Sequence, residues 1–352
     1  MIIVLKKGID KDKCRDLIEF IESRGVETVE IEGVSKKIIG IIGNKHNLDK
    51  DAITAFPGVE RVIPILEPYK LASRKFHPSN TVIKVGDAEI GGLDPVRIAG
   101  PCSVESEEQI WEIAENLSKQ GVQILRGGIF KPRSSPYSFQ GVGEVGLPWL
   151  RDAGKHYGLP VISEVMQINQ IEIMYDYVDI FQVGARNMQN FRLLEALGKT
   201  DKPIMLKRGI AATFNEFLMS AEYILSNGNE KVILCERGIR TFVEYTRNTL
   251  DVNVIPMVKN VSHLPIIVDP SHATGRTDLI TPVTLGSLIA GADGFIIEVH
   301  PRPYAALSDG AQQLTFEQYA QFMEDYNLIK DSLIKLREKK FAEINENVSN
   351  SL

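Results

Sequence analysis

The sequence has 352 residues, of which 43% are hydrophobic, so it is long enough and apolar enough to bury a large core. Its net charge of −6 gives no electrostatic support for a nucleic-acid partner. The apolar run at 2–5 is followed by Lys6 and Lys7 and is too short for a signal peptide or a membrane span. We therefore expect a cytoplasmic protein without a membrane partner.

Residues 1–66 read as a small α/β unit. Strands are predicted at 1–6, 26–31, 36–43 and 59–66, and helices at 10–23 and 48–55. The order βαββαβ is typical of a ferredoxin-like domain. Cys14 lies on the apolar face of the first helix and is predicted to be a core residue. Residues 67–80 contain two prolines among basic residues and are predicted to form a linker.

From residue 81 onward, a short hairpin at 82–90 precedes a regular alternation of apolar runs and helical stretches. The runs lie at 96–99, 123–126, 161–165, 180–183, 204–206, 232–235, 266–268 and 295–299. Helices are predicted near 106–120, 144–157, 167–176, 189–198, 213–227, 241–249, 280–291 and 315–338. Eight such units predict an α/β fold in which residues 81–338 form a (β/α)8 TIM barrel, with the hairpin closing its bottom.

An open doubly wound sheet is less favoured, because no glycine-rich dinucleotide fingerprint follows the first barrel strand. Residues 339–352 become rich in Asn and Ser and are predicted to be a frayed tail. The three cysteines lie far apart and form no CxxC motif, so neither a disulfide framework nor a structural zinc site is indicated.

Ionisable side chains follow almost every apolar run of the predicted barrel. Since the carboxyl ends of parallel strands share one rim, where such enzymes carry their chemistry, these groups should face one site. Desolvating so many charges has little structural use, whereas a pocket for two phosphorylated substrates needs several cations. The groups are Cys102, Arg126, Lys131, Arg133, Glu164, Arg186, Lys207, Arg208, Glu236, Arg237, His272 and Glu298.

Cys102, His272, Glu298 and Asp309 together are candidates for the ligands of one divalent metal ion. A mixture of soft and hard donors suits manganese, iron, cobalt or zinc more than magnesium. Taken singly, each has a structural interpretation: Cys102 as a small core residue, His272 as a helix cap, Glu298 as a partner of the backbone. Lys207 on the fifth strand would also suit a Schiff-base aldolase without a metal, but the neighbouring arginines disfavour this.

Six motifs of the chain resemble those of one family, the 3-deoxy-D-arabino-heptulosonate 7-phosphate (DAHP) synthases. The resemblance covers about residues 80–330, and residues 1–66 are similar to the ferredoxin-like regulatory domain of one subgroup. The motifs are Gly100-Pro101-Cys102-Ser103, Lys131-Pro132-Arg133-Ser134, Gly184-Ala185-Arg186-Asn187, Leu206-Lys207-Arg208-Gly209, Asp269-Pro270-Ser271-His272 and Glu298-Val299-His300.

The resemblance implies a metal-dependent transferase that condenses phosphoenolpyruvate with erythrose 4-phosphate and releases phosphate, the entry step of the shikimate pathway to aromatic amino acids. It also implies a phenylalanine or tyrosine effector and a homodimer or homotetramer. Carried over by motif, the metal ligands are Cys102, His272, Glu298 and Asp309.

The same resemblance assigns the substrate contacts. Arg126, Lys131 and Lys207 would hold the phosphoenolpyruvate carboxylate, while the Ala185 backbone, Arg186 and Arg237 would hold its phosphate. Arg133 and Ser134 would bind the aldose phosphate; Ser134 stands where many relatives have Thr, and either hydroxyl can donate. Lys131, or a water held by the metal, is the candidate proton donor, and Glu164 would stabilise the cationic carbon and orient the incoming water.

Two alternatives remain at this point. One is 3-deoxy-D-manno-octulosonate 8-phosphate synthase, which uses arabinose 5-phosphate; the motif Lys131-Pro132-Arg133 without an insertion, and the presence of Arg186, disfavour it. The other is a sensing protein with an inactive barrel, which the intact set of predicted ligands and cations disfavours. Residues 1–66 would also suit a purely structural or oligomer-forming module.

Overall fold

The structure of the chain, a computed structural model, describes residues 1–32, 37–42, 48–63, 68–132 and 135–351. Two compact units divide the chain: residues 1–79 with 261–263 and 339–352, and residues 80–260 with 264–338. Within the described ranges, no helix has both the length and the apolar character needed to cross a lipid bilayer.

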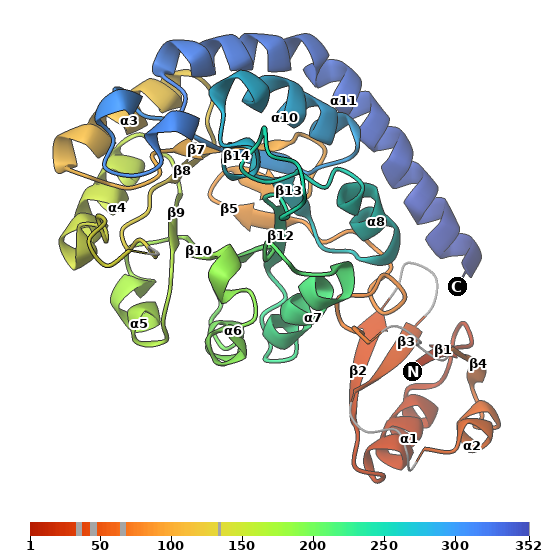
Figure 1. The fold of residues 1–352 in the computed structure, drawn as a ribbon. Helices are drawn as coiled ribbons and strands as arrows, with labels where there is room; N and C mark the ends of the chain where they lie inside the picture. The colour runs from red at the N-terminus through yellow and green to blue at the C-terminus, as the bar shows by residue number, and fades with distance from the viewer. Residues whose placement is uncertain (33–36, 43–47, 64–67, 133–134, 352) are drawn as a thin grey trace. The chain divides into compact units, whose positions relative to one another are not determined.

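The smaller unit contains a four-stranded antiparallel sheet of order β2-β3-β1-β4 (Figure 1). Its strands are β1 (Ile2–Leu5), β2 (Glu27–Glu32), β3 (Lys37–Ile42) and β4 (Val59–Ile63), and its helices are α1 (Lys11–Glu22) and α2 (Lys50–Thr54). Ile3 and Leu5 pack with Cys14 and Leu17 of α1 in one apolar cluster. The order βαββαβ and the placement of Cys14 in the core are as predicted.

The opposite face of this sheet is also buried, which explains why β1 is apolar at every position. Ile2 and Val4 point away from the helices, as the two-residue period of a strand requires, and pack with Phe76. A Cβ on Gly40 of β3 would lie 1.6 Å from a ring carbon of Phe76. Glycine at this position is therefore what lets the aromatic ring lie directly on the sheet.

The larger unit is a closed barrel of eight parallel strands in chain order, as predicted (Figure 1). Each strand contributes at least one side chain to an interior cluster, which includes Ile98, Ile124, Ile162, Ile180, Met205, Ile233, Ile267 and Ile296. The strands are β7 (Val96–Gly100), β8 (Ile124–Arg126), β9 (Val161–Glu164), β10 (Ile180–Val183), β11 (Ile204–Lys207), β12 (Val232–Glu236), β13 (Ile266–Val268) and β14 (Gly294–Glu298).

Helices follow the barrel strands. They are α3 (Glu107–Lys119), α4 (Gly146–His156), α5 (Asn169–Tyr175), α6 (Phe191–Gly198), α7 (Phe214–Leu225), α8 (Val254–Val261), α9 (Pro270–Thr274), α10 (Ile280–Ile289) and α11 (Phe316–Ser351). A hairpin of β5 (Ile83–Val85) and β6 (Ala88–Ile90) adds its apolar side chains to the barrel cluster. Its glycines Gly86 and Gly91 approach Pro160 and Pro265, which precede β9 and β13, so the hairpin closes the amino-terminal end as predicted.

Two helix predictions were wrong. The helix expected at 241–249 is a loop, because its backbone binds neighbouring segments instead: Ile239 bridges to Thr249, and the N–H groups of Arg247 and Asn248 donate to the carbonyls of Thr274 and Ala273. The last helix, expected to end near 338, continues to Ser351. Residues 335–347 contain no Gly or Pro and are rich in Lys and Glu, which favours this continuation.

A buried ion cluster lies just before β14, at the amino-terminal end of the barrel. Asp293 is 0% exposed; its carboxylate accepts from Lys259 Nζ at 2.9 Å, Arg337 Nη2 at 2.6 Å and the Ile266 N–H at 2.8 Å. Burial alone would raise the pKa of Asp293, but Lys259 and Arg337 lower it below its usual value. This carboxylate therefore joins three segments far apart in the sequence.

Candidate active site

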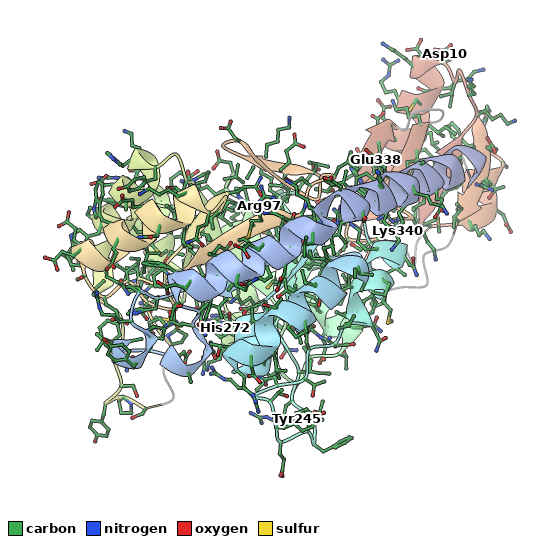
Figure 2. The ribbon with its side chains drawn as sticks, turned by 90° about the horizontal axis from the view of Figure 1, so that it is seen from above. Asp10, Arg97, Tyr245, His272, Glu338 and Lys340 are labelled. Carbon is green, nitrogen blue, oxygen red and sulfur yellow. The ribbon has the colours of Figure 1, made fainter. Side chains whose placement is uncertain are left out.

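A short helix places His272 at the carboxyl end of β13. Asp269 caps the amino terminus of α9 through a hydrogen bond from the His272 N–H to Oδ1, and Pro270 occupies the first turn, where its missing N–H costs nothing. Gly275 ends the helix in the left-handed conformation. In Figure 2, His272 lies on the same side of the barrel as Tyr245, a residue of the β12–α8 loop, and Arg97 at the start of β7 lies on the other side.

Three predicted metal ligands meet at this end of the barrel. Cys102, His272 and Glu298 each offer a ligand atom, and these atoms all lie within 4.8 Å of one another. Cys102 and Glu298 are 0% exposed. Glycine is required at position 100, at the end of β7 and two residues before Cys102. A Cβ there would lie 2.0 Å from the carbonyl oxygen of Arg126, so no larger residue fits. A thiol, an imidazole and a carboxylate this close suit a borderline divalent cation.

The electrostatics of this cluster favour a cation. Burial raises the pKa of the Cys102 thiol to about 11, and the Glu298 carboxylate adds to the rise. Burial on its own would raise the pKa of Glu298 as well, but the imidazole of His272 and the cations Arg126 and Lys131 lower it to about 2. Glu298 is thus ionised, whereas Cys102 needs a positive charge beside its sulfur to become a thiolate ligand.

Asp309 lies at the edge of this cluster. Its Oδ2 atom is 3.5 Å from Cys102 Sγ, and its Oδ1 atom is 3.6 Å from Arg247 Nη1. Among the described residues other than glycine, it is the one with a positive φ, at 45°. Such a backbone conformation costs energy and is found disproportionately at functional sites.

Four of the predicted substrate-binding cations are buried around the cluster: Arg126, Lys131, Lys207 and Arg237 are 4–7% exposed. Arg126 Nη1 donates to Glu298 Oε1 at 2.6 Å, and Lys131 Nζ donates to the Cys102 carbonyl and sulfur, both at 3.1 Å. Lys207 Nζ donates a hydrogen bond to Asp269 Oδ2. Buried cations held close together form a site that can accept more than one anionic group.

The remaining predicted site residues differ in burial and in their contacts. Glu164 is buried and accepts a hydrogen bond from Gln182 at 3.3 Å. Ala185 begins a short 3-10 turn in which Arg186 is exposed, with Nη1 3.4 Å from the Pro132 carbonyl oxygen. Arg133 and Ser134 lie outside the described residues.

Some strand-end charges of the sequence pair with each other. Arg208 donates to Glu236 at 3.0 Å and to Asp251 at 2.9 Å. The positive charge of Arg208 is therefore balanced by carboxylates of the protein and needs no ligand. Sequence reasoning also gave no role to Asp269, whose Oδ2 lies 2.8 Å from His272 Nδ1. A carboxylate on this nitrogen leaves Nε2 to face Glu298 and fixes the ring orientation. The position of Asp269 directly after an apolar run was the available signal.

A closed (β/α)8 barrel whose carboxyl rim gathers this donor cluster and several buried cations is typical of an enzyme. Residues 77–332 match the family model described as the DAHP synthetase I family, and residues 1–67 match the DAHP synthase ferredoxin-like domain. The chain therefore belongs to the DAHP synthetase I family, and it is an aldolase-type enzyme that catalyses a condensation.

Relatives agree with this assignment. A phospho-2-dehydro-3-deoxyheptonate aldolase of Thermotoga maritima is 48% identical over 95% of this chain and 98% of its own length. The crystal structure of a Thermotoga maritima protein of that name has a TM-score of 0.76 over the same shares of the two chains. A 2-dehydro-3-deoxyphosphooctonate aldolase of Geobacter sulfurreducens is 30% identical over 72% of this chain and 98% of its own.

Proposed function

We propose that this chain is a metal-dependent 3-deoxy-7-phosphoheptulonate synthase, which joins phosphoenolpyruvate to erythrose 4-phosphate and releases phosphate at the start of the shikimate pathway. The observation that carries the proposal is the convergence of the buried Cys102 and Glu298 with the partly exposed His272, beside four buried cations. The thiol, imidazole and carboxylate would hold one divalent ion, with Asp309 as the fourth ligand. Manganese, iron, cobalt and zinc all suit this donor set.

The cations would orient the two anionic substrates. Arg126, Lys131 and Lys207 would bind the phosphoenolpyruvate carboxylate; the Ala185 backbone, Arg186 and Arg237 would bind its phosphate. Arg133 and Ser134 would bind the phosphate of the aldose. Holding the enol carbon and the aldehyde in contact removes much of the entropic barrier of a two-substrate reaction.

A divalent ion in this site would supply Lewis-acid polarisation of the aldehyde carbonyl. Burial alone would lower the pKa of Lys131, but Cys102 and Glu298 raise it overall, so its ammonium group stays protonated and can donate to the new alkoxide. Glu164 would stabilise positive charge at the former enol carbon and orient the water that attacks it. Loss of phosphate from that adduct completes the reaction.

The choice of aldose tests the proposed function. We expect kcat/KM with erythrose 4-phosphate to exceed kcat/KM with arabinose 5-phosphate by about 10-fold or more. The two aldoses differ by one hydroxylated carbon, which a pocket fitted to the shorter sugar must exclude. Initial rates of phosphate release with each aldose measure this. A preference for the five-carbon sugar would instead favour the alternative function, that of a 3-deoxy-D-manno-octulosonate 8-phosphate synthase.

We also propose that the ferredoxin-like residues 1–66 are a regulatory domain that responds to phenylalanine or tyrosine, followed by the linker 67–80 and the catalytic residues 81–338. The protein would act in the cytoplasm as a homodimer or homotetramer. The match of residues 1–67 to a DAHP synthase ferredoxin-like domain supports this arrangement.

Removal of the first 80 residues is expected to abolish feedback inhibition. We expect phenylalanine or tyrosine to lower the rate of the full chain, because the bound effector changes the affinity for substrate by about 5-fold or more. A variant beginning at Thr81 should be unaffected. Dose–response curves for both proteins at matched substrate saturation measure this. Equal sensitivity of the two proteins would exclude residues 1–80 from the effector response and favour a structural role.

A further inference from the structure

Gln312 is a buried polar side chain to which the proposed mechanism assigns no role. It ends the 3-10 turn Gly310–Gln312, which begins directly after Asp309, and it is 3% exposed. Its Nε2 atom donates to Glu298 Oε2 at 2.6 Å, and its Oε1 atom accepts from Arg247 Nη1 at 2.8 Å. The amide therefore links a carboxylate of the donor cluster to an arginine on another loop.

The chemistry of its two neighbours dictates how the Gln312 amide is oriented. An ionised carboxylate can only accept hydrogen bonds, and a guanidinium can only donate them. The amide satisfies both neighbours when its nitrogen faces Glu298 and its oxygen faces Arg247, and in no other orientation. A glutamate at this position would bring a second carboxylate against Glu298.

Arg247 is itself held in place by contacts with the segment that carries His272. Its backbone N–H donates to the Thr274 carbonyl at 2.9 Å, and the neighbouring Asn248 Nδ2 donates to the His272 carbonyl at 3.0 Å. The guanidinium also lies 3.6 Å from Asp309 Oδ1. One chain of contacts, Glu298–Gln312–Arg247–Asp309, thus connects two of the proposed metal ligands. Asn248, next to Arg247, adds a contact with the segment of a third, His272.

We infer that Gln312, supported by Arg247, is a positioning residue for the metal site. By occupying Glu298 Oε2, it holds the carboxylate so that Oε1, which also accepts from Arg126 Nη1 at 2.6 Å, lies on the side of His272, 3.5 Å from Nε2. Partners of this kind orient metal ligands, and their loss typically lowers metal affinity about 10- to 100-fold. The inference rests on the proposed function, because it requires Glu298 to be a ligand.

The test is the affinity of the full-length protein for Co²⁺, measured by competition with a chelator and by the absorption of the cobalt–thiolate bond. We expect Gln312→Glu and Gln312→Leu each to weaken Co²⁺ binding by about 10-fold or more and to change the ligand-field spectrum. Gln170→Glu is the matched control: Gln170 is also 3% exposed, but its amide accepts from the Met166 N–H and contacts no proposed ligand. This control should bind Co²⁺ as tightly as the unmodified protein.

A second variant guards against misfolding at the buried position. Because the side chain of Arg247 is 41% exposed, we expect Arg247→Met to fold; it removes the support of Gln312 and should also weaken Co²⁺ binding. Unchanged affinity and spectrum in Gln312→Leu and Arg247→Met would overturn the inference while leaving the proposed metal site intact. If the unmodified protein showed no cobalt–thiolate absorption, the metal site of the proposed function would fail, and the inference with it.

Discussion

Cys102→Ser is expected to abolish tight binding of a divalent cation and, with it, condensation activity. The substitution keeps the size of the side chain but replaces a polarisable sulfur, which becomes a thiolate beside a metal, with a hydroxyl that stays protonated. Because loss of an outer partner alone changes metal affinity about 10- to 100-fold, loss of this direct ligand should exceed about 100-fold. Metal content after dialysis and the initial rate of phosphate release measure the two effects.

Cys235→Ala is the matched control for this experiment. Cys235 is also 0% exposed and lies on a barrel strand, but its side chain packs in the apolar interior cluster with Ile233 and Ile267. The control should retain the cobalt–thiolate absorption that Cys102→Ser loses. A Cys102→Ser protein with full metal content and full turnover would remove Cys102 from the active site.

Asp293→Asn is expected to cause the largest loss of stability, about 3–5 kcal/mol in the free energy of unfolding. The substitution removes the buried carboxylate that the partly buried Lys259 and the buried Arg337 share, and removing one partner of a buried ion pair is strongly destabilising. Denaturant unfolding followed by circular dichroism measures the change. Asp293 lies at the amino-terminal end of the barrel, so the folded variant should still bind Co²⁺.

The same carboxylate gives a pH dependence with a defined sign. The pKa of Asp293 is lower in the folded chain than in the unfolded chain, so its stabilisation is complete above about pH 4 and is lost as the pH falls through the folded pKa. Asp278→Asn is the matched control, since Asp278 pairs with Arg276 through two hydrogen bonds but is exposed; because solvent screens an exposed pair, its loss should destabilise the chain far less than Asp293→Asn does. Equal losses in the two variants would contradict this account.

The regular alternation of apolar runs and amphipathic stretches was sufficient to predict the barrel and its preceding hairpin. A strand buried on both faces is largely apolar, so continuous apolar runs such as 232–235 and 266–268 are recognisable as barrel strands from the sequence. Local pattern failed where tertiary contacts competed with it. The segment 241–249 has helical spacing, but its N–H groups bind the carbonyls behind His272, and a helix would have to give up those bonds.

Position at the end of a strand was a good guide to Cys102, His272 and Glu298, which the fold brings together. It could not separate charges that face the site from those that neutralise each other, as Arg208 and Glu236 do. It also gave no signal for Gln312 and Arg247, which lie in loops without periodicity. Their importance depends on a hydrogen bond between residues 65 positions apart.

By itself, the amino-acid sequence determined most of the segments that become strands and helices, because burial periodicity and turn residues act over a few neighbouring positions. It also determined which chemical groups stand at the rim of the barrel. Only the tertiary structure decided which of those groups touch, because closing eight strands into a ring brings Cys102 and Glu298 together across almost two hundred residues. Electrostatic interactions in a desolvated site depend on separations of a few ångströms, and distance along the chain does not set those separations.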